Sequence, residues 1–182
     1  MTEDPIANAE RDLQQVALAQ RDPAAFEPLY DRYLDQIYAF CYRRLGSREL
    51  AEDATSQVFL QALAALPKFR AHSFRAWLYT IARNVVIDVH RARPALPLID
   101  DAALDQLIVD GELDWRASEI DVRQLLSQLT PEQRDVVELR LSGMTGPEIA
   151  EILGRSAGSV RALQFRAYQQ LRAVLNAQEV TK

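Results

Sequence analysis

Apolar residues recur every three or four positions along most of this chain, a spacing that predicts α-helices. No stretch alternates apolar and polar residues at period two, so nothing in the pattern favours β-strands. The clearest apolar stripe lies in residues 24–46 and comprises Phe26, Leu29, Tyr30, Tyr33, Ile37, Phe40, Cys41 and Leu45. Gly46 is suited to end this helix, because glycine adopts a left-handed backbone at little cost. We therefore predict an all-α fold.

Two more helices are predicted before residue 94. Ser47 is positioned to cap the first of them, and Pro67 ends it. Ser73 is positioned to cap the second, and Pro94 and Pro97 close the region. The residues expected to face inward are Leu50, Ala54, Val58, Leu63, Phe74, Trp77, Leu78, Ile81, Ala82 and Val85. A three-helix bundle of about 70 residues has a small core, so we expect modest stability.

Helical signals resume near Glu119. The string TPEQ places Thr130 at an N-cap, Pro131 in the first turn and Gln133 at the reciprocal capping position. After a break at Gly143, TGPE repeats this logic in residues 145–148. Ser156 is positioned to cap a last helix that runs to about Leu175.

These signals divide the chain into two small helical domains joined by a linker. The expected segments are an acidic N-terminal segment (1–23), a helical bundle (24–93), an acidic linker (94–118), a second helical domain (119–176) and a tail (177–182). The linker has two early prolines, scattered acids and weak periodicity, which are typical of a connecting segment.

Composition narrows the class of protein. The 182 residues are 48% hydrophobic and 26% charged, as in an ordinary globular chain. A single cysteine excludes an internal disulfide framework and any multi-cysteine metal site. No apolar run reaches the ~20 residues that span a bilayer, and the acidic N-terminus does not resemble a secretory signal. We therefore expect a cytoplasmic protein.

No pattern indicates an enzyme. The sequence contains no paired nucleophile and base, no phosphate-binding loop and no cluster of metal ligands. His72 and His90, with only Asp88 between them as a further ligand, make a poor metal site. We expect neither a cofactor nor a metal.

Charge is distributed unevenly, although the formal net charge is only −5. Residues 68–93 hold six basic side chains and one acid, Asp88, and residues 155–172 hold four arginines and no acid. Residues 94–120, between these stretches, carry a net charge of −6. Basic clusters are typical of proteins that bind polyanions, although solvated helix faces are the plainer alternative.

The string GPEIAEILGRSAGSVRALQFRAY favours a helix-turn-helix. Ala150 allows close helix crossing, Gly154 turns the corner, and Val160 anchors the second helix. An ordinary helical hairpin is the alternative. The residues expected to face bases are Ser159, Arg161, Ala162 and Phe165, and those expected to contact phosphates are Arg155 and Arg166.

Aromatic and basic residues interleave in residues 67–93, a pattern suited to single-stranded nucleic acid. Phe69 lies in a loop, where a packed aromatic is less expected. Asn84 offers both a donor and an acceptor to a base edge. Trp77 shares the apolar stripe of Phe74, so packing in the core is its simpler role.

Three strings, in this order, resemble a bacterial alternative sigma factor of the extracytoplasmic-function (group IV) type within the sigma-70 family. They are FEPLYDRYLDQIYAFCYRRLGSRELAEDATSQVFLQAL, FRAWLYTIARNVVIDVHRAR and LTPEQRDVVELRLSGMTGPEIAEILGRSAGSVRALQFRAYQQLR. They resemble conserved regions 2.1–2.2, 2.3–2.4 and 4 of that family, and together they cover nearly three quarters of the chain.

The resemblance implies a subunit that binds core RNA polymerase, through its β′ coiled coil and β flap, and directs it to promoter DNA. The implied polymerase contacts are Asp53, Ser56, Gln57 and Phe59. The implied contacts to the −10 element, with Phe69 and Asn84 at a flipped base, are Lys68, Phe69, Arg70, Trp77, Arg83, Asn84, Asp88 and Arg91. The implied contacts to the −35 element are Arg155, Ser159, Arg161, Ala162, Phe165 and Arg166.

The same resemblance places the acidic linker near the polymerase catalytic channel and suggests an anti-sigma factor as a further partner. It also implies association with the nucleoid. Departures from the family pattern at Ser56 and Gln57, and at Leu163 and Gln164, leave the polymerase contacts and the −35 sequence open. A stand-alone helix-turn-helix regulator is the alternative, but it leaves residues 67–93 and the linker unexplained.

Overall fold

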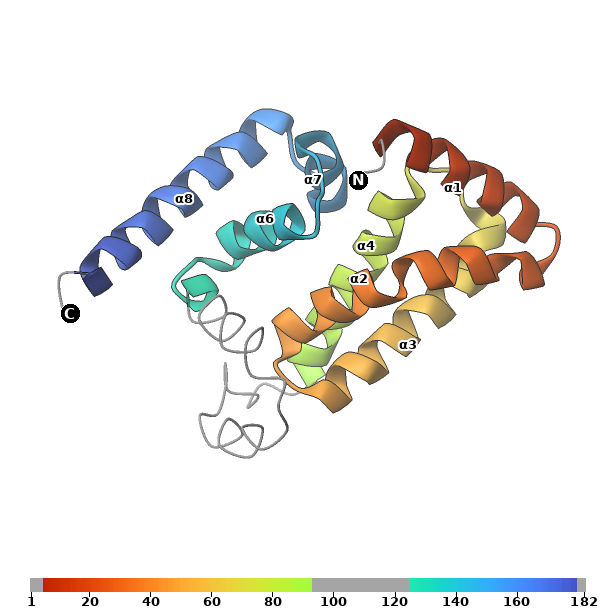
Figure 1. The fold of residues 1–182 in the computed structure, drawn as a ribbon, viewed down its shortest axis with the longest axis horizontal. Coiled ribbons are helices and arrows are strands. Elements are labelled where there is room, and N and C mark those ends of the chain that lie inside the picture. The colour runs from red at the N-terminus through yellow and green to blue at the C-terminus, as the bar shows by residue number, and fades with distance from the viewer. Residues whose placement is uncertain (1–4, 93–124, 180–182) are drawn as a thin grey trace. The chain divides into compact units, whose positions relative to one another are not determined.

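The structure is a computed structural model, and it describes residues 5–92 and 125–179 (Figure 1). Every regular element in those two ranges is a helix, so the prediction of an all-α fold is confirmed. The chain divides into two compact units, and the main boundary between them falls between residues 94 and 95. The division into five segments stays a prediction, and the linker at 94–118, Pro94, Pro97 and the helix start near Glu119 lie outside the described residues.

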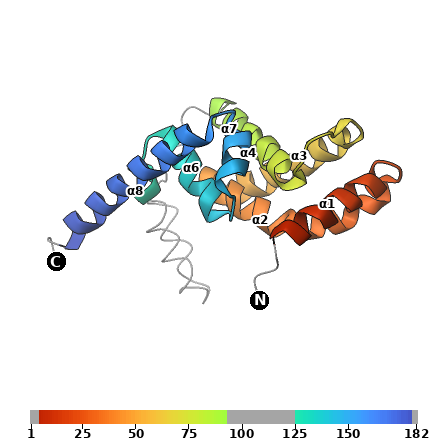
Figure 2. The ribbon, with the colours of Figure 1, turned by 90° about the horizontal axis from the view of Figure 1, so that it is seen from above.

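In residues 5–92, which the structure describes, four α-helices and two short 3₁₀ helices build the N-terminal unit. They are α1 (Pro5–Ala19), η1 (Pro23–Phe26), α2 (Glu27–Leu45), α3 (Arg48–Ala65), η2 (Leu66–Lys68) and α4 (Phe74–Ala92). Helices α2, α3 and α4 pack on one another, and α1 packs against α2 and α4. Figures 1 and 2 show α1 alongside α2, with the turn that joins them at one end of the unit.

Local sequence signals set the helix ends as predicted. Gly46 has a φ of 73°, and its N–H donates to the Tyr42 carbonyl. The Ser47 hydroxyl accepts from the N–H of Leu50 and caps α3. The Ser73 hydroxyl accepts from the N–H of Ala76, 3.1 Å away, at the start of α4.

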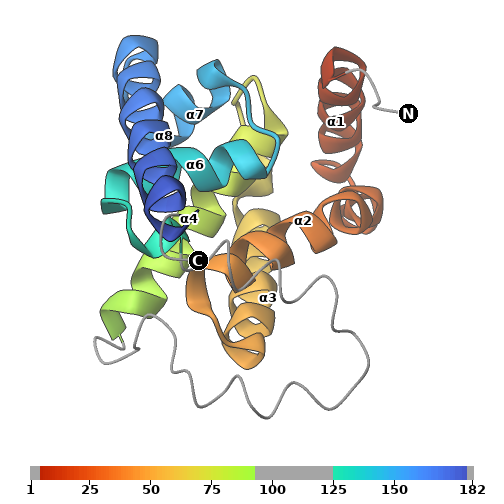
Figure 3. The same ribbon diagram turned by 60° about the vertical axis from the view of Figure 1, so that its left-hand side comes forward.

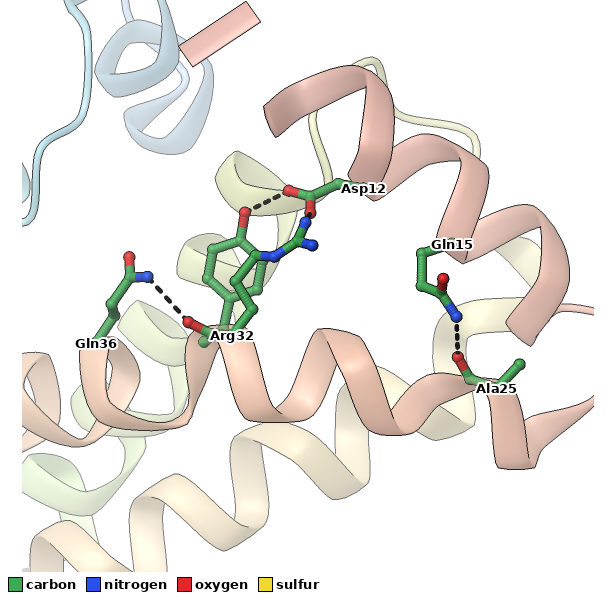
Figure 4. Close-up of polar contacts among 6 residues, drawn as sticks. Asp12, Gln15, Ala25, Arg32 and Gln36 are labelled. Carbon is green, nitrogen blue, oxygen red and sulfur yellow. Dashed lines mark hydrogen bonds and ion pairs between the residues drawn. The ribbon is translucent and has the colours of Figure 1, made fainter. Parts of the chain in front are cut away.

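Helix α1 occupies most of the segment for which we expected only acidity. Among the side chains of α1 that the structure describes, the buried apolar ones are Val16 and Ala19. A buried carboxylate, Asp12, instead accepts hydrogen bonds from Arg32 and Tyr33 of α2 (Figure 4). Burial, together with the Asp12 carboxylate, raises the pKa of the Tyr33 hydroxyl above its ordinary value. Because a carboxylate fills a buried position of α1, the spacing of apolar residues alone does not predict this helix.

The core of the N-terminal unit follows the predicted stripes, with four exceptions. Leu29, Ile37, Phe40, Val58 and Phe74 are each at most 1% exposed. Tyr30 and Leu63, which we expected to face inward, are both 38% exposed. Trp77 and Ile81 are only half-buried. The predicted stripes therefore identify the buried face of each helix correctly, and the errors are residues at the border between the buried and exposed faces.

Cys41 is predicted to resist alkylation until the N-terminal unit unfolds. Its side chain has no solvent exposure, and burial raises the pKa of the thiol to about 11 from an ordinary value of 9.0. Two pKa units mean about 100-fold less thiolate at neutral pH. A thiol-specific reagent at pH 8 should therefore label the native chain at least about 100 times more slowly than the denatured chain. Fast labelling without denaturant would contradict this burial.

The C-terminal unit contains three described helices, α6 (Pro131–Leu141), α7 (Gly146–Leu153) and α8 (Ala157–Glu179). Thr130 and Gln133 form the predicted reciprocal capping box, and Thr145 pairs with Glu148 in the same way before α7. The Ser156 hydroxyl accepts from the N–H of Ser159 and caps α8. Helix α8 continues past the expected end at Leu175.

Both apolar and charged residues fill the interior of this unit. Helix α6 packs against α8, and Figure 3 shows α7 near the start of α8. Val136, Met144, Ile149 and Val160 are at most 2% exposed. Glu138 is also fully buried, and its carboxylate accepts from Arg134 at 2.6 Å one helical turn away.

Candidate nucleic-acid interface

Four of the residues predicted to contact the −10 element lie along one line of α4. Trp77, Asn84, Asp88 and Arg91 are spaced by seven, four and three residues, so they share one face of the helix. The line is about 21 Å long at 1.5 Å per residue. Arg83 was predicted with them, but it lies about 100° around the helix from Asn84.

The loop between η2 and α4 lies next to the N-terminal end of this line. Phe69 is 6% exposed, and its ring packs edge-on against Phe74 and Trp77, with centroids 6.1 and 5.1 Å apart. Our expectation of an unpacked loop aromatic was therefore wrong, because the chain turns at Pro67 and directs Phe69 back onto α4. Trp77 is half-buried and contacts Phe74, which agrees with a packing role.

Cations border the loop and the helix face. Lys68 and Arg70 are exposed, and an Arg70 Nη1 donates to the backbone carbonyls of Pro67 and Phe69 at 3.3 and 2.6 Å. Asp88 and Arg91 pair at 3.8 Å, but both side chains are more than two thirds exposed. Exposed pairs contribute little, so Arg91 can exchange this partner for another anion at small cost.

A second exposed face lies on α3. Asp53, Ser56 and Gln57, predicted to contact the polymerase, are exposed on the same side. Phe59 was predicted with them but is 5% exposed and packs edge-on against Phe26 and Tyr30.

Sequence reasoning missed Leu60 on this α3 face. It lies three and four residues after Gln57 and Ser56, which places it beside them on the helix surface, two turns from Asp53 on the same face. Its side chain is 69% exposed, the largest exposed fraction among the big apolar residues of the described chain. The sequence signal that could have identified it is an apolar residue at a position of this helix where the pattern predicts exposure.

Helices α7 and α8 form the predicted helix-turn-helix geometry. Gly154 has a φ of 61°, where a residue with a side chain is strained. The residues of α8 that anchor it in the core are Val160, Leu163 and Ala167, each at most 3% exposed. The predicted DNA contacts that are exposed on the opposite face are Arg161, Ala162, Phe165 and Arg166. Ser159 lies at the edge of that face, half-buried.

Polar contacts hold the turn and the exposed face of α8. Arg155 lies in the turn and pairs with Glu132 in the first turn of α6. Gln164 accepts from Arg140 of α6 at 3.4 Å and donates to the Tyr168 hydroxyl at 3.1 Å. Tyr168 is 49% exposed, lies one turn after Phe165 and two turns after Arg161 on the same face of the helix, and was not among the predicted contacts.

In the part of the chain that the structure describes, no three His, Cys, Asp or Glu side chains gather as metal ligands. Within the same residues, no helix is long and apolar enough to cross a lipid bilayer.

Two family models match the chain. Residues 29–94 match sigma-70 region 2, and residues 119–171 match sigma-70 region 4. The first match covers α2 from Leu29 onward, α3 and α4, and the second covers α6, α7 and α8 as far as Leu171.

Similar proteins cover nearly the whole chain. The ECF RNA polymerase sigma factor BldN of Streptomyces coelicolor is 36% identical over 94% of this chain and 69% of its own length. The ECF RNA polymerase sigma factor SigW of Bacillus subtilis is 31% identical over 90% of this chain and 94% of its own length.

Solved structures share the fold. CnrH, in complex with the cytosolic domain of CnrY, has a TM-score of 0.72 and 26% identity over 90% of this chain and 96% of that one. The sigma factor RpoE from Bartonella quintana, in complex with the anti-sigma factor NepR, has a TM-score of 0.63 and 24% identity, and it covers 83% of this chain and 96% of that one.

Proposed function

The chain belongs to the ECF RNA polymerase sigma factors of the sigma-70 family, and from this premise we propose how its two units divide the work of promoter recognition. As an alternative sigma factor it is a non-enzymatic subunit for transcription initiation. The proposal assigns single-stranded DNA to the N-terminal unit and duplex DNA to the C-terminal unit.

The N-terminal unit captures the opened −10 element along α4. The observation that carries this proposal is the line of Trp77, Asn84, Asp88 and Arg91, which continues into the basic loop at Lys68 and Arg70. An aromatic edge followed by a base-reading amide suits an unstacked strand. Phe69 is buried beneath this surface, so its role is to support the Trp77 ring from below until a base takes the place of the Phe69 ring.

The C-terminal unit reads the −35 element with the exposed face of α8. Arg161 is placed to read guanine, and Phe165, which is 63% exposed, is placed to meet a thymine methyl group. Arg155 and Arg166 contact phosphates. Leu163 is buried, so the departure from the family pattern at that position changes the core rather than the DNA contacts.

The exposed face of α3 is the polymerase contact. Asp53, Ser56 and Gln57 supply polar groups around the exposed Leu60, and a polar rim around an apolar centre is the usual anatomy of a protein interface. We assign the β′ coiled coil to this face and the β flap to the C-terminal unit. Phe59 supports the face from the interior.

Run-off transcription with core polymerase on genomic fragments tests the function as a whole. The full chain is expected to give core polymerase new start sites and to co-purify with it. Failure of both would overturn the proposal, whereas duplex binding without polymerase would favour a stand-alone regulator.

Arg161→Ala is predicted to relax sequence discrimination by the C-terminal unit. Losing one bidentate base contact reduces discrimination by about 1–3 kcal/mol, roughly 5- to 150-fold. The measurement is holoenzyme binding to a −35 duplex selected from a randomised library, compared with a scrambled duplex. Arg166→Ala is the matched control, and it should weaken binding to both duplexes equally. An equal loss in Arg161→Ala would assign that side chain to a phosphate.

Three further expectations rest on family membership. An anti-sigma partner is expected because the sigma factor RpoE, which shares this fold, was solved with one. The −6 charge of residues 94–120 suits a basic polymerase channel. We also expect the chain to act in the cytoplasm, at the nucleoid.

A further inference from the structure

Gln20, directly after α1, holds the backbone of the loop that leads into the −10 surface. Its Nε2 donates to the carbonyl of Leu66 at 2.9 Å and to the carbonyl of Phe69 at 3.2 Å. These carbonyls belong to the first residue of η2 and the residue that follows η2, so one amide joins both ends of the turn. Because both partners are acceptors, only the NH₂ group of the amide can occupy this position.

Other hydrogen bonds of these carbonyls are local to the loop. The Leu66 carbonyl also accepts from the N–H of Phe69, and the Phe69 carbonyl also accepts from Arg70. Such bonds close a turn, but they do not fix its position against the rest of the unit. Gln20 is 46 and 49 residues away in sequence from its two partners, so its bonds tie the turn to a different element.

The end of α1, which bears Gln20, is itself held in place by hydrogen bonds. The N–H of Gln20 donates to the Val16 carbonyl and extends α1 by one residue, and Val16 is 3% exposed. Asp12 anchors α1 to α2 through Arg32 and Tyr33 (Figure 4). The amide therefore projects from a rigid helix end.

The hydrogen bonds of Gln20 affect the proposed DNA-binding surface through Phe69. Fixing the Phe69 carbonyl fixes the backbone from which its ring extends, and the centroid of that ring is 5.1 Å from that of Trp77. Trp77 heads the α4 line that ends at Arg91.

We propose that Gln20 is a positioning residue for capture of the −10 strand: its amide sets the shape of the Leu66–Phe69 turn and, through Phe69, the base preference at the N-terminal end of the α4 surface. The proposal rests on the proposed function of the N-terminal unit. Gln20 touches no base itself, and its effect is on the discrimination between bases.

Gln20→Met tests this role, because methionine has a similar length but no donor. Gln20→Glu is the second variant, since an ionised carboxylate also cannot donate to the carbonyls. Gln15→Met is the matched control: Gln15 lies on the same helix, and its Nε2 donates to a carbonyl outside the loop, that of Ala25, at 2.6 Å (Figure 4).

The probe is a library of single-stranded oligonucleotides randomised over the −10 element, captured by holoenzyme and sequenced. Both Gln20 variants lose the two hydrogen bonds of this amide, and we expect them to lower discrimination at one or more bases of the element by about 2- to 10-fold, the net effect of one hydrogen bond. Gln15→Met should leave the base profile unchanged, and all variants should bind core polymerase within about twofold of wild type. A purely structural loss reduces the active fraction and therefore leaves the base profile of the captured strands intact.

The outcomes separate the two proposals. A wild-type holoenzyme that captures strands without any base preference would overturn the proposed function. A wild-type preference that survives in both Gln20 variants would overturn the role of Gln20 alone. Equal flattening by Gln15→Met would also overturn it, because the effect would then belong to α1 as a whole.

Discussion

Phe74→Ala is expected to lower the free energy of unfolding of the N-terminal unit by about 3–5 kcal/mol, the usual cost of removing a buried phenyl ring. Phe74 is 1% exposed, and its ring meets those of Phe26, Tyr33, Phe69 and Trp77 at centroid distances of 5.6–6.3 Å. Small domains have about 5–15 kcal/mol in total, so this one change removes a large share.

Denaturant unfolding followed by tryptophan fluorescence measures this loss. The chain has two tryptophans, so Trp115→Phe in every sample leaves Trp77, beside Phe74, as the reporter for the N-terminal unit. Leu60→Ala is the matched control, because Leu60 belongs to the same unit, is 69% exposed, and a surface truncation changes stability by about 0.5 kcal/mol or less. A loss below about 1 kcal/mol in Phe74→Ala would contradict the central place of this ring.

Asn84→Ala is expected to impair open-complex formation by about 5- to 150-fold, the equivalent of one lost base-reading amide. Asn84 is exposed in the middle of the α4 line, so its removal leaves no cavity and no buried group without a partner. Holoenzyme assembly should therefore be unchanged.

Strand opening is followed with a fluorescent base analogue in the −10 element, and assembly by titration with core polymerase. Arg83→Ala is the control on the same helix, because Arg83 lies about 100° away from the proposed surface. If polymerase affinity falls in parallel with opening, Asn84 has a structural role instead. If Arg83→Ala causes the same defect, the α4 line does not define the binding surface.

Sequence alone predicted those features that depend on a few neighbouring residues. Ser47, Thr130 and Ser156 cap helices as expected, and Gly46 and Gly154 take positive φ values as expected. Each of these is decided within four residues by backbone hydrogen bonds that must be satisfied at a helix end. The exposed face of α8 was predicted equally well, because a helix that buries one apolar stripe exposes the opposite side to solvent.

Features that depend on distant residues escaped prediction. The burial of Phe69 is decided by Phe74, Trp77 and the turn at Pro67, and no local pattern reports such a fit. The tie from Gln20 to Leu66 spans 46 residues and consists of one amide. Helix α1 escaped because its anchor is a carboxylate, Asp12, in a position where periodicity looks for an apolar side chain.

Helix α1 also bears on the design of chimeric sigma factors. The region 2 match begins at residue 29, after α1 and η1. A hybrid that exchanges only the matched segment would give Arg32 and Tyr33 a foreign neighbour in place of Asp12, and the loop at Phe69 a foreign helix end in place of Gln20. Crossover points placed ahead of residue 5 keep these couplings intact, so promoter preference is best transplanted together with the N-terminal helix.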